Sequence, residues 1–369
     1  KADMAATHGM VLSLIHGVVI SIVCTAIMPQ FLRSFTSDET VIAMGVTYSR
    51  VAFMFAVVIM AAMAFEKIFQ AVGRMNITMI GLMGGSVCNI ILDPLLIFGI
   101  GPFPKMGIAG AALATGIGQM VPVIFYLIVY FVSPIPVRLR SGCLKPDAKM
   151  ALQLYSIGVP AIIAQGAMSV MNYCVNLIFG SLDSSYVTAY GIVYKIQQFV
   201  LFAAFGLRDA ITPIVSFSYG MQNAKRIREG VRCGLMYTIV LMLVCTAAVE
   251  ILAQPLAGIF SLSAGTMGLC VTGLRVLAVS FVFAGANIAI QGVFQATEGG
   301  VQSLLVSLLR QLIFVLPAAW LFAHLLPAGV WLAFPIAEVL TAVIAAVLLL
   351  HTAGKGRLSQ RAHAVSLDK

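Results

Sequence analysis

The chain has 369 residues, of which 61% are hydrophobic and only 9% are charged. Soluble proteins carry about 25% charged residues, so this composition, with a mean hydropathy of +1.03, excludes an ordinary soluble protein. The formal net charge of +9 does not indicate nucleic-acid binding, because most Lys and Arg residues lie in alternate loops between apolar runs.

Apolar runs recur along the whole chain, and each has the length of about 20 residues that a helix needs to cross a bilayer. We therefore expect an all-α polytopic membrane protein, a helical bundle with ten spans in this chain. The spans are predicted at 10–32, 41–69, 77–99, 108–132, 155–180, 187–217, 233–253, 268–293, 303–325 and 330–351.

The loops on one side of these spans are basic. They are the segments 133–153 and 220–232 and the tail after residue 351. Because Lys and Arg favour the cytoplasmic side, we expect these loops and the carboxy terminus in the cytoplasm. The protein is expected in the inner (plasma) membrane of a bacterium, as a multi-pass monomer.

An internal repeat relates the two halves of the chain. Phe69-Gln70-Ala71 recurs as Phe294-Gln295-Ala296, and Arg50 recurs as Arg275 at the same offset. Each half then has an even number of spans with one orientation, which is typical of parallel transporter repeats.

The repeat predicts two lobes, an amino-terminal lobe at 1–140 and a carboxy-terminal lobe at 141–369 that includes a short basic tail. By this division the second lobe has six spans and the first has four. We therefore expect two further helices ahead of Lys1.

Asp93 is the strongest functional signal, because it lies inside the predicted span 77–99. A charged side chain at the centre of a spanning helix costs about 2.5–3.5 kcal/mol on insertion scales. Asn89 is four residues earlier and shares its helical face, and Pro94 predicts a kink. An ionised Asp with an amide neighbour can bind Na⁺, and a desolvated Asp can exchange a proton. The alternative is that Asp93 only hydrogen-bonds a neighbouring helix.

The second half contains another pair of intramembrane charges, Arg310 and Glu338. One interpretation is a salt bridge that holds the lobe together, and the other is that Glu338 lines a cavity and meets cationic substrate or a proton. Lys195 is a further deep basic residue. The remaining candidate cavity residues are polar and uncharged: Gln165, Asn172, Asn176, Tyr194, Asn287 and Gln291.

No cofactor is expected. The seven cysteines form no CxxC pair, and the chain has neither an HExxH motif nor a phosphate-binding loop with its Lys. Direct use of ATP is therefore not predicted, and an ion gradient is the expected energy source.

Five segments together resemble the MATE family of multidrug and toxic-compound exporters. They are Gln70–Gly73, Asp93–Gly99, Gly206–Gly220, Ser303–Gln311 and Gly329–Glu338. The resemblance implies twelve helices in two six-helix lobes, with export of organic, often cationic or amphipathic compounds by alternating access. It also implies antiport against entering H⁺ or Na⁺.

The resemblance places Asn89 and Asp93 in the cation-coupling site of the amino-terminal lobe, with Thr115 as the matching hydroxyl. Another aspartate of that site would precede Lys1. The spans of the second half lack the carboxylates of the sodium-coupled branch, so the chain resembles the bacterial subgroup coupled through the amino-terminal lobe.

Three alternatives remain open. A lipid-linked oligosaccharide flippase of the same superfamily would need a strongly cationic cavity, and only Lys195 and Arg310 are deep basic candidates. An integral-membrane enzyme would need a His or carboxylate cluster in a loop, where the longest loop, 133–153, offers only Asp147. A non-functional truncated remnant is the third.

Overall fold

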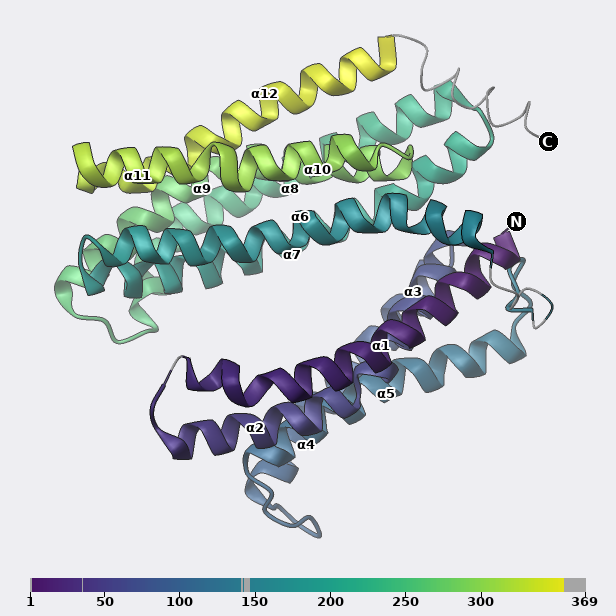
Figure 1. The fold of residues 1–369 in the computed structure, drawn as a ribbon. Helices are drawn as coiled ribbons and strands as arrows, with labels where there is room; N and C mark the ends of the chain where they lie inside the picture. Colours follow the sequence, from purple (N-terminus) through teal and green to yellow (C-terminus); the bar gives the residue numbers. More distant parts are fainter. Residues whose placement is uncertain (1, 35, 141, 143–146, 355–369) are drawn as a thin grey trace. The chain divides into compact units, whose positions relative to one another are not determined.

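The computed structural model describes residues 2–34, 36–140, 142 and 147–354. Every regular element in this part of the chain is helical (Figure 1). In these residues nine helices are long and apolar enough to span a membrane, or ten when one bent pair counts as a single span. The all-α, polytopic prediction is thereby confirmed. Lys145 and the basic tail, both assigned to the cytoplasm above, lie outside the described residues.

The chain folds into two compact units, Lys1–Leu154 and Tyr155–Lys369. The division between the units falls after Leu154, later in the chain than the lobe boundary expected between residues 140 and 141. It lies inside a helix that begins at Ala148, so the first turns of that helix belong to the first unit.

The first unit contains five helices, of which α4 and α5 make the most extensive pairing. They are α1 (Ala2–Arg33), α2 (Glu39–Met54), α3 (Ala56–Ala71), α4 (Met75–Phe98) and α5 (Ile108–Val132). Helix α4 continues through Pro94 without a break, and the kink expected there stays a prediction.

Small residues allow α4 and α5 to pack closely. A methyl group added at Gly85 would lie 2.5 Å from the carbonyl oxygen of Gly118. Near the opposite end of the contact, the hydroxyl of Tyr126 donates to the carbonyl oxygen of Thr78 at 3.0 Å. Because the first contact joins the two backbones and the second joins a buried side chain to a backbone carbonyl, they fix the position of the α4 face that carries Asn89.

The span predicted at 41–69 is broken. Helices α2 and α3 meet at Phe55 with a bend of 45°, and the Phe55 N–H donates to the carbonyl oxygen of Ala52 at 3.1 Å. The ring of Phe55 occupies the space that a side chain at Gly116 of α5 would fill. Neither Gly nor Pro stands at the break, so the sequence did not predict it.

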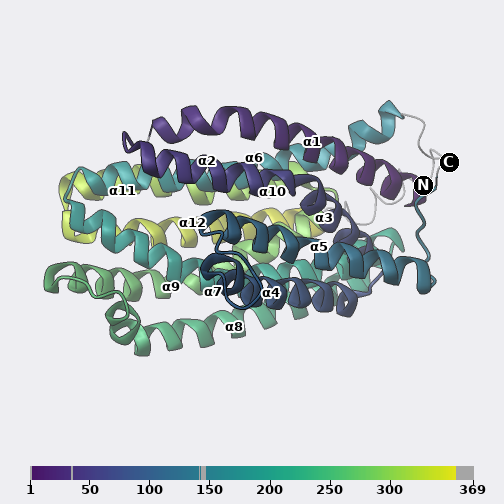
Figure 2. The same cartoon turned by 90° about the horizontal axis from the view of Figure 1, so that it is seen from below.

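The second unit is built around α9. Figures 1 and 2 show its helices running side by side, and α9 packs against α7, α8, α10 and α12. Its elements are α6 (Ala148–Gly180), α7 (Ser184–Gly220), α8 (Ala224–Gly258), α9 (Ala264–Ala296), α10 (Gly300–Leu308), a π-helical turn η2 (Leu309–Ile313), α11 (Val315–Leu325), a 3₁₀ turn η3 (Pro327–Leu332) and α12 (Ala333–Gly354).

An aromatic cluster joins α6, α7 and α12 in the core of this unit. The ring of Phe179 packs edge-on against Trp331, with 5.1 Å between the centroids. Tyr190 stacks on Phe334 at 6.0 Å. Trp331 also covers Gly273 of α9, where a methyl group would lie 2.9 Å from the indole. These buried rings position the start of α12, which carries Glu338 further on.

Candidate functional site

A groove between α4 and α5 contains two of the three predicted coupling residues. Its volume is about 280 Å³, and both Asn89 and Thr115 line it. The structure therefore brings these two side chains to one site. Ser86 and Gln119 line the same groove and were not predicted. Each lies three or four residues from a predicted member, and helical spacing alone could have indicated them.

Asp93 lies one turn beyond Asn89 on the same helix and outside the groove lining. Its Oδ1 atom is buried without a hydrogen-bond partner among the described residues, and so is Nδ2 of Asn89. Leaving a buried polar group unpaired costs about 1–3 kcal/mol. Oδ1 of Asp93 therefore has unused capacity to accept a proton or a cation, and Nδ2 of Asn89 has an unused donor.

The Thr115 hydroxyl is engaged locally, since it donates to the carbonyl oxygen of Ala111 at 3.0 Å. Its lone pairs remain available, because a hydroxyl can donate one hydrogen bond and still accept others. Carboxylate, amide and hydroxyl oxygens are hard ligands that suit a cation such as Na⁺, and a carboxylate can also take up a proton. The residue types present on α4 and α5 thus fit binding of either H⁺ or Na⁺.

The second unit contains a buried ion pair. Nε of Arg310 lies 2.8 Å from Oε1 of Glu338, and both side chains are 8% exposed. Asn287 on α9 completes the cluster, since its Nδ2 donates to Oε2 of Glu338 at 2.8 Å and to the Glu338 carbonyl oxygen at 3.1 Å. The salt bridge suggested as one interpretation of Arg310 and Glu338 is present.

A π-helical turn presents Arg310 together with its neighbour Gln311. The turn is closed by the Phe314 N–H, which donates to the carbonyl oxygen of Leu309, five residues earlier, at 3.0 Å. Adjacent residues point about 100° apart in a regular α-helix, yet here both are buried and line one pocket. π-turns of this kind are frequent at functional sites.

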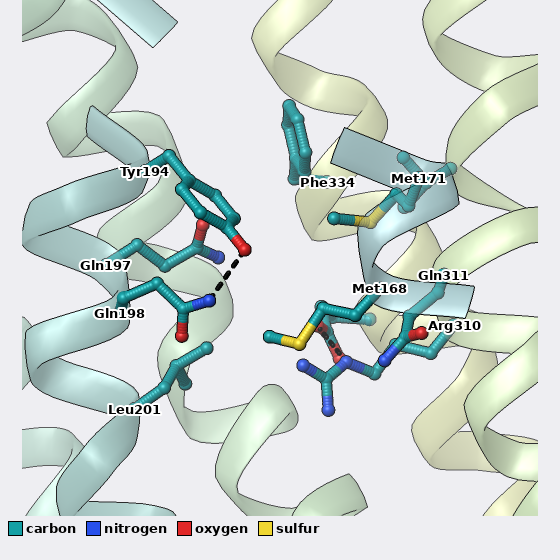
Figure 3. A pocket seen from close by; sticks show the side chains of 11 residues that line it. Met168, Met171, Tyr194, Gln197, Gln198, Leu201, Arg310, Gln311 and Phe334 are labelled. Atoms are coloured by element: carbon teal, nitrogen blue, oxygen red, sulfur yellow. Dashed lines mark hydrogen bonds and ion pairs between the residues drawn. The ribbon is translucent and has the colours of Figure 1, made fainter. Parts of the chain in front are cut away.

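This pocket has a cavity volume of about 30 Å³ and is lined by residues of α6, α7, η2, α11 and α12. Tyr194 on α7 faces it, and its hydroxyl oxygen accepts a hydrogen bond from Nε2 of Gln198 at 2.6 Å (Figure 3). Met168, Met171 and Phe334 supply the apolar wall. Glu338 therefore forms the ion pair and also lines a cavity, and its contact with substrate or a proton stays a prediction.

Of the predicted cavity residues, Tyr194, Arg310 and Glu338 line this pocket, and Asn287 contacts Glu338 from outside the lining. The other five also lie outside the lining. Lys195 and Gln165 are exposed, Asn176 donates to Asn172 on its own helix, and Gln291 donates to the carbonyl oxygen of Ser303 at 3.4 Å. Three pocket polar residues, Gln197, Gln198 and Gln311, were not predicted.

Comparison with known proteins identifies the family to which this architecture belongs. Residues 1–95 and 160–321 match the MatE family model. The chain belongs to the MatE family. As a MatE protein with this set of apolar helices, it is a multi-pass membrane protein and not an enzyme.

Curated relatives of this MatE chain include the multidrug export protein MepA of Staphylococcus aureus. It is 25% identical over 334 residues, which cover 90% of this chain and 73% of MepA. MepA of Staphylococcus saprophyticus is 24% identical over 302 residues, covering 82% of this chain and 66% of that protein.

Solved structures share the fold. One is an outward-facing conformation of a multidrug resistance MATE family transporter of the MOP superfamily, with a TM-score of 0.89, 24% identity, and coverage of 97% of this chain and 79% of that one. Another is a MATE structure in the bent conformation, with a TM-score of 0.89, 23% identity, and coverage of 98% and 80%.

Proposed function

We propose that this MatE protein is a multidrug exporter driven by the entry of H⁺ or Na⁺. Its cargo would be organic, often cationic or amphipathic compounds, moved by alternating access across a bacterial inner membrane. The names of the MepA relatives, multidrug export proteins, support the cargo class. The observation that carries the coupling role is Oδ1 of Asp93, an acceptor that is buried without a hydrogen-bond partner among the described residues, one turn from Asn89 on α4.

Coupling requires that the cation and the drug favour different helix arrangements, so that each shifts the equilibrium against the other. The α4–α5 contact offers such an element. The Asn89 side chain packs against Gly118, where a methyl group would lie 2.9 Å from its Cβ. Because packed interiors transmit small displacements, neutralisation of Asp93 by a proton or Na⁺ would shift α4 against α5 and alter the groove.

The proposed orientation follows from charge. The segments 133–153 and 220–232 are basic and would face the cytoplasm. Drug would then enter from the cytoplasmic side, and the cation would enter from outside. No ATP is required in this scheme, and a monomer contains both sites.

The flippase alternative is less well supported. A lipid pyrophosphate carries several negative charges and would need more than one free buried cation. In the described residues of the second unit, Glu338 neutralises Arg310, and Lys195 is exposed and outside the pocket lining. These placements favour a drug exporter.

The test is complementation of a drug-sensitive bacterial strain with the natural gene and with Asp93→Asn, with ethidium as the cargo. We expect Asp93→Asn to lose resistance and ethidium export, because an amide does not titrate near neutral pH and has no negative charge to attract Na⁺. Asp183→Asn, which changes an exposed acid at the start of α7, is the matched control and should retain export. Unchanged export by Asp93→Asn would exclude the coupling role.

A further inference from the structure

Arg310 has more hydrogen-bonding capacity than its partner uses. A guanidinium carries five N–H donors in a planar fork, and only Nε faces Glu338, at 2.8 Å. Within the part of the chain that the structure describes, no other polar atom contacts the guanidinium. Figure 3 shows its terminal nitrogens directed into the pocket. A buried cation with unused donors indicates a missing acceptor.

Glu338 does not compete for the same space. Its Oε1 faces Nε of Arg310, and its Oε2 accepts from Asn287 on the α9 side. The two oxygens of the Glu338 carboxylate are therefore paired with Arg310 and Asn287. The edge of the Arg310 guanidinium that faces the pocket presents only N–H donors. A ligand at this edge must supply acceptor oxygens, and a carboxylate fits best because it can pair with the fork in two parallel bonds.

Tyr194 and the apolar residues of the pocket suit the same ligand. The Tyr194 hydroxyl accepts from Gln198 at 2.6 Å, which leaves its own proton free to donate. Met168, Met171 and Phe334 form an apolar wall suited to an aromatic ring. The cavity volume of about 30 Å³ exceeds the roughly 10–15 Å³ that one water molecule needs. It has room for a small group such as a carboxylate, so the pocket would hold one end of a larger ligand.

We propose that this pocket is a cargo subsite that binds the carboxylate of zwitterionic aromatic compounds, through the terminal nitrogens of Arg310 and the hydroxyl of Tyr194. The inference rests on the proposed drug-export function and narrows its substrate class. Compounds with an aromatic cation and a free carboxylate would bind better than the same compounds with that carboxylate esterified.

The test uses rhodamine B and the ethyl ester of rhodamine B. Both carry the same aromatic cation, and only the parent dye has a free carboxylate. Dissociation constants are measured by fluorescence anisotropy on the purified protein expressed from its natural gene. We expect the free acid to bind on the order of tenfold more tightly, the effect of one additional hydrogen bond to a charged group. Equal affinities would overturn the proposal. Because this comparison uses only the wild-type protein, it tests the proposal even if the variants below fail to fold.

Two variants should change the preference for the free acid, measured as the ratio of the ester's dissociation constant to that of the free acid, in opposite directions. Arg310→Lys keeps a charge for Glu338 but lacks the planar fork, so the preference for the free acid should fall to near one. Glu338→Gln keeps an acceptor for Arg310 but removes the opposing negative charge, so the preference should rise. If the ion pair is only structural, both variants will weaken the two dyes in parallel, which would contradict the proposal.

Arg275→Gln is the control, because it removes an exposed positive charge on α9 outside the pocket and should leave the ratio unchanged. Binding in detergent needs no ion gradient, so the result is independent of the coupling test. If Asp93→Asn still exports drug while the wild-type protein prefers the free acid, the coupling proposal fails and the carboxylate subsite stands.

Discussion

Gly118 of α5 lies directly against the side chain of Asn89 of α4, so that a methyl group on Gly118 would lie 2.9 Å from the Asn89 Cβ. Gly85 approaches the Gly118 carbonyl oxygen equally closely, at 2.5 Å for an added methyl group. The helix face that carries the proposed coupling residues is thus held by backbone contact with α5. A side chain added at Gly85 or Gly118 must therefore displace this face of α4.

Gly118→Ala should impair drug export, because the new methyl group pushes Asn89 out of the groove. Overpacking of this kind costs about 1–3 kcal/mol, and most of that range exceeds the roughly 1 kcal/mol that Ala gains over Gly in a helix. We expect lower ethidium export and a lower melting temperature in detergent.

Gly84→Ala is the matched control on α4. A methyl group there would lie 3.7 Å from Cγ1 of Val121, an ordinary contact, so export should be unchanged and stability equal or slightly higher. If Gly118→Ala behaved like Gly84→Ala, the close contact with Asn89 would have no functional role.

The Arg310–Glu338 ion pair should show strong energetic coupling. Arg310→Met or Glu338→Met alone leaves a buried charge without its partner, which costs about 3–5 kcal/mol. The double variant leaves no unpaired charge and should lose much less stability than the two single variants combined. Free energies of unfolding in detergent for the four proteins give this comparison, and additive losses would show that the pair is not coupled.

The Tyr126–Thr78 hydrogen bond should stabilise the α4–α5 pair. Tyr126 is fully buried, and its hydroxyl donates to a backbone carbonyl 3.0 Å away. Tyr126→Phe removes the donor and should lower the free energy of unfolding by about 1 kcal/mol. Tyr48→Phe, at an exposed tyrosine on α2, should change stability little. An equal loss in both variants would argue against a specific role for the Tyr126 hydroxyl.

The spans could be predicted because the bilayer imposes length and apolarity on every crossing helix. The break at Phe55 could not, since the contact made there is long-range: the Phe55 ring fills the space beside Gly116, some sixty positions further along the chain. The π-turn at Leu309–Ile313 likewise has no signal in the local sequence that would predict it. Both features depend on tertiary packing and carry no local Gly or Pro signal.

The candidate sites were predicted to different extents. A charge in an apolar run is visible in sequence, and this drew attention to Asp93, Arg310 and Glu338. Neutral pocket residues such as Gln119 and Gln197 have no such signal, because their role depends on which helix face meets a neighbour. Lys195 was singled out for its charge, yet it lies outside the pocket lining.

The central claim is that Asp93 couples cation entry to drug export. The most direct measurement is ethidium transport in proteoliposomes under an imposed pH gradient and, separately, an imposed Na⁺ gradient. For the natural protein and for Asp183→Asn, we expect one of the two gradients to accelerate transport. For Asp93→Asn we expect neither gradient to have an effect. Acceleration of Asp93→Asn equal to that of the natural protein would contradict the account.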